Sequence, residues 1–370
     1  MQIKSQPWIH SWYGDLLGFH LIPLIFAFLA FMKWPPFHVA SYAHMDMLIL
    51  GILLIDWAHI FAQWHRIYYN PMETIKAKWI YPISYILLIP IVGLYIYSGS
   101  RLHVEVALVY FVIFHFIKQH FGFMKIYSKI DGPKTKFESW SETALFYLCM
   151  WTPVIYWHIS FPKKDFYWAA RILPIPYINI IFNIACILYA LSAAIYIVTE
   201  IRRWKRNGII NVPKNLALIA AAVAWGGVSL FSDVAVLVMF TVVLTHDVSY
   251  TVLVWMTCRR DEQIVKKKIN WFSWWSAPGF LFYVLILVLG SHLIMVLHLE
   301  IARDAELDYA IYGKIFNNIT SSSVVWQHFG WGLFFATQAH HYFIDKFLWK
   351  KEKDLSYMVM TGQYQVEKQV

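Results

Sequence analysis

Charge is scarce in this chain. Asp, Glu, Lys and Arg together make up 14% of its 370 residues, whereas hydrophobic residues make up 59%. A soluble domain has about a quarter charged residues and about half apolar ones. The shortage of charge therefore excludes a disordered chain, a basic nucleic-acid-binding domain and an ordinary soluble enzyme. It favours a protein that crosses a membrane several times, because lipid accommodates apolar surface that water does not.

Cysteine is scarce as well. Cys149, Cys186 and Cys258 lie far apart, and no pair has the C-x-x-C spacing. This excludes a disulfide framework, a zinc ribbon and a cluster held by thiolates. The first residues also lack a basic stretch that leads into a short apolar core and a small-residue cleavage site, so we expect no signal peptide.

Positive charge exceeds negative charge, since 31 Lys and Arg against 22 Asp and Glu give a net charge of +9. The basic residues gather in short loops between apolar runs. This distribution is typical of the signals that orient a membrane protein beside anionic lipid. We therefore expect no nucleic-acid partner.

Ten segments approach the length of about 20 mostly apolar residues that a membrane-spanning helix needs. They lie at 14–33, 43–65, 79–99, 103–125, 141–161, 175–201, 214–231, 233–257, 273–298 and 323–348. The seventh is short and contains Gly226 and Gly227, so it is either a full span or a re-entrant element. The sequence thus predicts an all-α fold, a polytopic transmembrane helix bundle of about ten spans that forms a single domain over 1–370.

Basic residues follow the even-numbered segments. They are Arg66, Lys76 and Lys78; Lys125, Lys129, Lys134 and Lys136; Arg202, Arg203, Lys205 and Arg206; Arg259, Arg260, Lys266, Lys267 and Lys268; and Lys346, Lys350, Lys351 and Lys353. The loop after the fifth segment, with Lys163, Lys164 and Arg171, is an exception. Positive residues mark the cytoplasmic side, so we expect both termini in the cytoplasm. The protein is expected to be integral to a bacterial inner (cytoplasmic) membrane.

Histidine is abundant for so apolar a chain, with 16 residues. Ionisable groups inside a membrane are expensive and usually face the interior of the bundle. On the predicted topology, one group falls in the inner half of the bilayer or at its cytoplasmic edge: His20, His59, His65, His115, His120, His246, His340 and His341. Several helices that bring imidazoles to one depth are what a metal site requires.

Carboxylate, amide and phenol groups accompany these histidines. Asp56 precedes His59 by three residues and Gln63 follows it by four, so the three share one helix face. The predicted metal ligands are His59, His115, His120, His246, His340 and His341, with Asp56 and Asp345 as further ligands or as groups that orient an imidazole. Tyr250 is the candidate proton donor. Asp247 lies about 100° round its helix from His246, so we expect it to point elsewhere.

The spacing inside two histidine pairs complicates this site. On an ideal helix His59 and His65 diverge by about 120°, and His115 and His120 by about 140°. Both members of a pair bind only if the helix is distorted or if two metal ions lie side by side. A second histidine group lies at the outer ends of the spans, where it is interfacial or forms a second metal or haem site: His44, His103, His158, His292, His298 and His328.

Two short motifs resemble the histidine boxes of a known class. His115 and His120 form H-x(4)-H, and Gln338, His340 and His341 form Q-x-HH. They resemble boxes of the histidine-rich integral-membrane non-haem iron oxygenases, which include fatty-acid desaturases and hydroxylases. The second motif is one residue shorter than the usual box, a third box is missing, and ten spans are more than this class usually has. The resemblance therefore implies only a histidine-rich iron site.

The leading hypothesis is a membrane-embedded oxidoreductase with one or two iron ions, although zinc, copper or manganese would also suit imidazole ligands. Its substrate would be a membrane lipid or another hydrophobic molecule, which it would hydroxylate, desaturate or cleave oxidatively, with an electron-donor protein as partner. Two alternatives stay open. One is a transporter of metal ions or protons, and the other is a haem-binding electron carrier, which needs two facing histidines.

Overall fold

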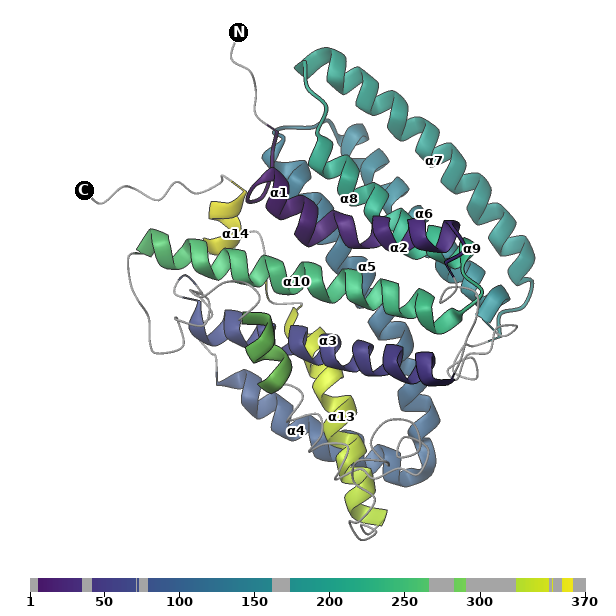
Figure 1. The fold of residues 1–370 in the computed structure, drawn as a ribbon, viewed down its shortest axis with the longest axis vertical. Coiled ribbons are helices and arrows are strands. Elements are labelled where there is room, and N and C mark those ends of the chain that lie inside the picture. The colour runs from purple at the N-terminus through teal and green to yellow at the C-terminus, as the bar shows by residue number, and fades with distance from the viewer. Residues whose placement is uncertain are drawn as a thin grey trace. The chain divides into compact units, whose positions relative to one another are not determined.

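The structure is a computed structural model that describes residues 6–34, 42–70, 72, 79–161, 174–265, 283–290, 324–345, 348 and 355–361. Every regular element in these ranges is helical, which confirms the predicted all-α fold (Figure 1). The sequence predicts one domain, and the packing gives two compact units. Unit 1 comprises Met1–Ser41 and Phe116–His246, and unit 2 comprises Tyr42–His115 and Asp247–Val370.

Two long helices begin in one unit and end in the other. They are α5 (Arg101–Ile130) and α10 (Ala235–Val265). Unit 1 also contains α1 (Trp12–Asp15), η1 (Leu16–His20), α2 (Leu21–Phe31), α6 (Lys136–Ser160), α7 (Ile178–Asn207), α8 (Val212–Ala222), η6 (Val223–Gly227) and α9 (Val228–Phe231). Unit 2 also contains α3 (Tyr42–Tyr69), α4 (Ile80–Tyr95), η3 (Ile96–Ser100), a helical segment over 283–290, α13 (Val324–Asp345) and α14 (Leu355–Met360).

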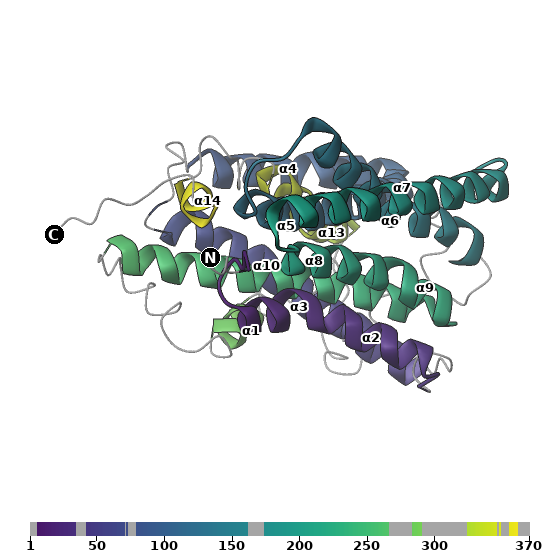
Figure 2. The same cartoon turned by 90° about the horizontal axis from the view of Figure 1, so that it is seen from above.

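Local sequence sets the helix ends of unit 1. Thr135 and Glu138 form a reciprocal capping box at the start of α6, which satisfies two backbone N–H groups that the helix leaves unpaired. Asn211 caps α8, and Pro213 lies in its first turn. Gly208 ends α7 at φ 75°, a left-handed conformation that glycine adopts at little cost. Helices α6 and α7 then pack side by side (Figures 1 and 2).

A buried ionic cluster joins helices of unit 1 at one end. The carboxylate of Glu142 on α6 accepts hydrogen bonds from Lys134 and from Lys214 Nζ, the latter at 2.8 Å. Arg203 Nη1 of α7 lies 3.6 Å from Glu142 Oε1. Lys214 also donates to Glu200 Oε1 at 2.6 Å. Because buried charges are costly unless paired, this cluster fixes the relative positions of α6, α7 and α8.

In unit 2, helix α13 crosses α4 at very short range. A Cβ added to Gly332 would lie 2.9 Å from the Cα of Gly93 and from the carbonyl oxygen of Ile89. Glycine at both helices lets the backbones approach, as is common between helices in membranes. Toward the C-terminal end of α13 the hydrophobic cluster of Ile67, Tyr81, Ile344 and Leu348 joins α3, α4 and α13.

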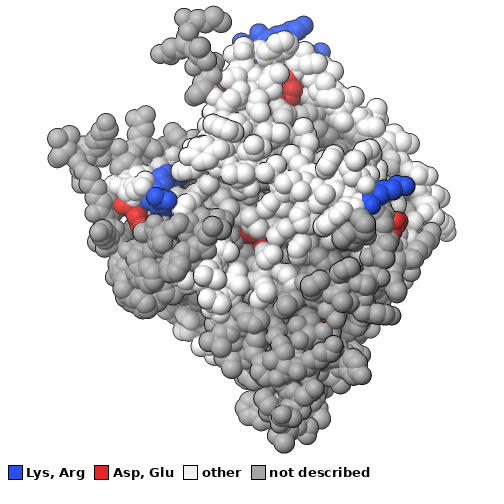
Figure 3. All heavy atoms as spheres, in the orientation of Figure 1, with Lys and Arg blue, Asp and Glu red and all other residues white. Residues whose placement is uncertain are grey.

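Six helical stretches of the described chain are long and apolar enough to cross a membrane. They are Trp12–Phe31, Ile80–Gly99, Leu102–Ile130, Ile178–Asn207, Val212–Phe231 and Ala235–Ile264. The seventh predicted segment, 214–231, thus lies within the continuous helical stretch Val212–Phe231 of 20 residues. Charged side chains are few and lie apart on the face that Figure 3 shows. These features suit an integral membrane protein, while the count of ten spans and the placement of the termini stay predictions.

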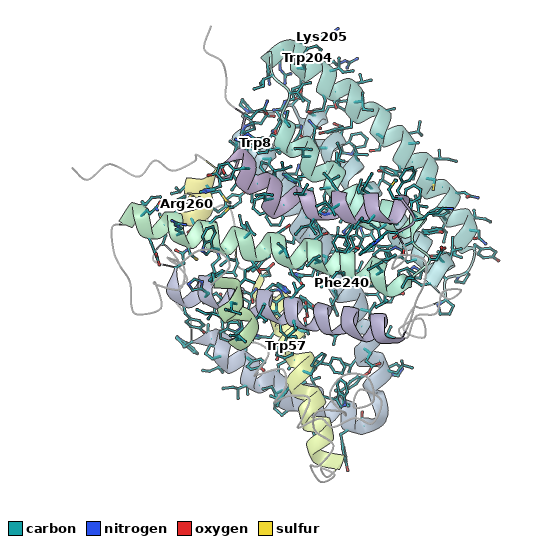
Figure 4. The ribbon with its side chains drawn as sticks, in the orientation of Figure 1. Trp8, Trp57, Trp204, Lys205, Phe240 and Arg260 are labelled. Atoms are coloured by element: carbon teal, nitrogen blue, oxygen red, sulfur yellow. The ribbon has the colours of Figure 1, made fainter. Side chains whose placement is uncertain are left out.

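The remaining predicted spans differ in how much of them the structure describes. Helices α3, α6 and α13 lie over 43–65, 141–161 and 323–348. Most of 273–298 falls outside the described residues, apart from the helix over 283–290. Trp204 and Lys205, labelled in Figure 4, lie near the C-terminal end of α7, so the basic residues predicted for the loop after the sixth segment belong to this helix.

Candidate metal centre

In unit 2, two helices each present a row of three polar residues with the same sequence spacing, and the two rows face each other. On α3, Asp56, His59 and Gln63 are buried, and on α13 Gln338, His341 and Asp345 repeat that spacing with acid and amide exchanged. The Gln338 amide donates a hydrogen bond to Asp56, and Gln63 Nε2 donates to Asp345 Oδ1 at 3.1 Å. His59 and His341 meet between these two pairs. The partners follow in the same order along both helices where α3 and α13 cross (Figure 1).

The geometry of the histidine pair points to a shared ligand. The Nε2 atoms of His59 and His341 lie 2.9 Å apart, and their ring centroids lie 4.5 Å apart with perpendicular planes. A head-on N–H···N hydrogen bond at this distance would place the centroids about 5.2 Å apart. Two nitrogens that point at one atom about 2.1 Å away, at an angle of about 90°, would place them about 4.5 Å apart. The observed separation suits two adjacent ligands of one metal ion, and it also suits a bent N–H···N hydrogen bond between the two rings.

His115 on α5 supplies a third imidazole. One ring nitrogen from each of His59, His115 and His341 lies within 4.8 Å of the others. The His115 ring centroid lies 5.0 Å from that of His341. On its other side His115 Nδ1 lies 3.9 Å from Asp345 Oδ2. All three side chains are buried, so helices α3, α5 and α13 bring three neutral nitrogen donors to one point inside unit 2.

Carboxylates surround this imidazole group. His59 Nδ1 lies 3.1 Å from Asp247 Oδ1 and 3.5 Å from Asp56 Oδ1. An acid at Nδ1 favours the tautomer that carries its proton there, which leaves the Nε2 lone pair for a metal. Sequence reasoning missed Asp247, which was expected to point away from His246. Its signal was present, because a carboxylate within a long apolar helix is itself expensive.

Acidic groups outnumber basic ones around the site. Asp56 and Asp247 are buried, the Asp345 side chain is 13% exposed, and Arg66 is the one buried lysine or arginine among the described residues of unit 2. Arg66 is close enough to Asp345 to interact with its charge. With all three carboxylates ionised and the imidazoles neutral, this group would have two negative charges in excess, whereas buried acids without a cation keep their protons. A divalent metal ion at the three imidazoles would neutralise it, which matters because uncompensated buried charge is unfavourable.

Two tyrosines complete the surroundings. The Tyr250 hydroxyl donates to Asp345 Oδ1 at 3.1 Å, and its ring centroid lies 5.8 Å from that of His59. Tyr342, which sequence reasoning also missed, donates to Gln338 Oε1 at 2.9 Å. Its ring centroid lies 4.7 Å from that of His115. Trp57, labelled in Figure 4, follows Asp56 on α3 and is fully buried.

The other predicted histidine ligands have contacts of their own. His340 points away from His341, as neighbours on a helix do, and its Nε2 lies 2.9 Å from Ser84 Oγ. His120 and His246 belong to unit 1, where their ring centroids are 6.2 Å apart and His246 stacks on Phe116 at 3.8 Å. The site described here is built from unit 2 alone.

The remaining histidines of the predicted inner group have their own partners. His20 Nε2 lies 3.5 Å from the hydroxyl of Tyr127 in unit 1. His65 Nδ1 lies 3.1 Å from the hydroxyl of Tyr283 in unit 2. Of the outer group, His103 is exposed and His158 Nδ1 lies 2.9 Å from the carbonyl oxygen of Val154. His44, His292, His298 and His328 lie outside the residues whose side chains are described.

The arrangement suits a transition metal. Three imidazoles, with Asp345 as a fourth oxygen donor or as the group that holds His115, leave coordination positions for a small molecule and a substrate. Neutral imidazoles favour iron, zinc or copper over magnesium or calcium. No family model, curated protein or solved structure matches this chain.

Proposed function

We propose that the protein is an integral-membrane oxidoreductase in which His59, His115 and His341 hold one iron ion. The observation that supports this most strongly is the convergence of three buried imidazoles, with the Nε2 atoms of His59 and His341 2.9 Å apart and a His115 nitrogen within 4.8 Å of a nitrogen of each. The three carboxylates beside the imidazoles also suit a divalent ion, which would hold them in their ionised form. The sequence leaves open one or two iron ions, and three convergent imidazoles suit one.

The substrate follows from where the site lies. Its ligands come from long helices in a chain dominated by apolar residues, so a hydrophobic molecule such as a lipid or acyl chain reaches it from the bilayer. Iron with open positions supplies oxygen activation when it is bound. The reaction class is hydroxylation, desaturation or oxidative cleavage, and an electron-donor protein supplies reducing equivalents.

The protein's own groups have separate tasks in this proposal. Asp247 and Asp56 face His59 Nδ1 and keep its Nε2 directed at the metal. Asp345 binds the metal or orients His115. Tyr250, whose hydroxyl contacts Asp345 at 3.1 Å, exchanges a proton with that carboxylate.

Metal analysis of matched variants tests the proposal. The full chain, purified in detergent under anaerobic conditions and loaded with Fe²⁺, should retain one iron per chain. His341→Ala should lose it, whereas His340→Ala should keep it, because that neighbouring buried ring contacts Ser84 instead. His115→Ala should also lose its iron. Size-exclusion chromatography of this variant shows that it is folded. Equal iron in all four proteins would refute the site.

Further measurements distinguish the oxidoreductase from the haem carrier and the transporter. Nitric oxide added to the Fe²⁺ protein should give the electron paramagnetic resonance signal of an iron–nitrosyl complex, since the site has open positions. A Soret band would instead select the haem carrier. Failure to retain any metal, together with metal flux in liposomes, would select the transporter and overturn the oxidoreductase.

A further inference from the structure

A second pair of buried side chains in unit 2 lies outside the metal centre. The hydroxyl of Tyr283 lies 3.1 Å from His65 Nδ1, and the ring centroids are 5.4 Å apart. Tyr283 is 1% exposed and His65 is 8% exposed. Tyr283 comes from the helix over 283–290 and His65 from α3, so two segments far apart in the chain form this contact.

The pair is linked to the metal centre by packed aromatic groups. Tyr283 and Tyr250 belong to one buried cluster with Ala58, Ala62, Val254, Cys258 and Leu287. The Tyr250 ring centroid lies 5.8 Å from that of His59 and 6.1 Å from that of His341. A buried path therefore runs from the imidazole ligands to Tyr250 and on through the other members of this cluster to Tyr283.

Each tyrosine on this path has its own proton acceptor. Tyr250 donates to Asp345 and Tyr283 faces the imidazole nitrogen of His65. A phenol loses an electron readily only when its proton leaves with it, because the oxidised phenol is a very strong acid. Inside a water-poor cluster a base at hydrogen-bond distance has to receive that proton. Tyr85 offers a contrast, because its hydroxyl lies 2.8 Å from the hydroxyl of Thr337, which is no base.

We infer that Tyr283 and His65 form a proton-coupled redox pair that passes single electrons to the metal centre. The inference rests on the proposed function, which supplies the oxidant: iron oxidised by dioxygen. The Tyr283 O–H bond would break, and one electron would pass through the buried cluster that holds Tyr250 to the oxidised metal ion, which would take it up. The proton forms a new N–H bond at His65 Nδ1, whose ring carries its own proton on Nε2. An electron-donor protein then restores the phenol.

Radical detection in matched variants tests this pair. The full chain, loaded with Fe²⁺ in detergent, is mixed with oxygen, frozen within milliseconds and examined by electron paramagnetic resonance. The wild type should give a tyrosyl radical whose hyperfine pattern changes when ring-deuterated tyrosine is incorporated. Tyr283→Phe, which removes only the hydroxyl, should lose this signal, and Tyr85→Phe should keep it. His65→Ala should lower the radical yield at least tenfold.

The outcomes distinguish the two proposals. Iron retained and oxygen consumed, with no radical or with equal radical in Tyr283→Phe and wild type, would overturn the redox pair and leave the oxidoreductase standing. Iron absent from the wild type by elemental analysis would overturn the metal centre, and the redox pair would fall with its oxidant. A radical of wild-type yield in His65→Ala would remove His65 from the step.

Discussion

Replacing Asp247 by Asn tests whether the carboxylates beside His59 prepare it for metal binding. Asp247 Oδ1 lies 3.1 Å from His59 Nδ1, and both side chains are fully buried. Asparagine keeps the size but presents either an oxygen or an N–H group to Nδ1, so the tautomer with a free Nε2 is no longer enforced. Loss of such an outer partner weakens metal binding by about 10–100-fold, or about 1.4–2.8 kcal/mol.

The same helix supplies the control. Asp261 on α10 is also fully buried, but its carboxylate accepts hydrogen bonds from Asn70 and Ser356 and pairs with Arg260, which Figure 4 labels. Affinity is measured in detergent by competition between the protein and a chelator for Co²⁺, whose visible spectrum reports coordination. Asp261→Asn should keep the wild-type affinity. An equal affinity in Asp247→Asn would refute the orienting role.

Four further outcomes follow from the packing, the charges and the site. Gly332→Ala should lower the melting temperature, since its Cβ meets backbone of α4 at 2.9 Å, whereas Gly122→Ala, which meets nothing within 4 Å, should not. Glu142→Gln should destabilise the protein by about 3–5 kcal/mol, measured by denaturant unfolding, because buried cations lose their partner. Burial lowers the pKa of Lys134 to about 8, and repulsion from Lys214 acts in the same direction, while the unfolded chain keeps that proton up to about 10.5. Stability should therefore rise between these pH values, and Lys134→Met should flatten the rise in unfolding free energy. Divalent metal at about 100 times its dissociation constant should stabilise the wild type by about 2.7 kcal/mol in calorimetry, and chelation should reverse this.

The polar faces of α3 and α13 show what can be predicted from the spacing of residues in the sequence and what cannot. The positions of Asp56, His59 and Gln63 predict one helix face, and the structure places all three toward α13. The complementary order on α13, with acid and amide exchanged, was visible in the sequence but was not read as a pair. The spacing of residues along a helix shows which side chains share one face, but it does not show which other helix that face packs against.

Histidines next to each other show where such reasoning fails. His340 and His341 are equivalent by composition and depth, yet only His341 joins the imidazole group, because one residue turns a helix by about 100°. Asp247 was set aside by the same rule applied to its neighbour His246. Asp247 does point away from the His246 side of its helix, but there its carboxylate meets His59 Nδ1.

Composition and periodicity alone determined the all-helical class, the apolar segments and the residue types able to bind a metal, since these depend on local properties of the chain. Only the tertiary structure decided which imidazoles meet, that three buried acids share their site and that Tyr283 lies beside His65. Those contacts join residues up to 282 positions apart, and the helix rotations that create them come from packing, which no local pattern encodes.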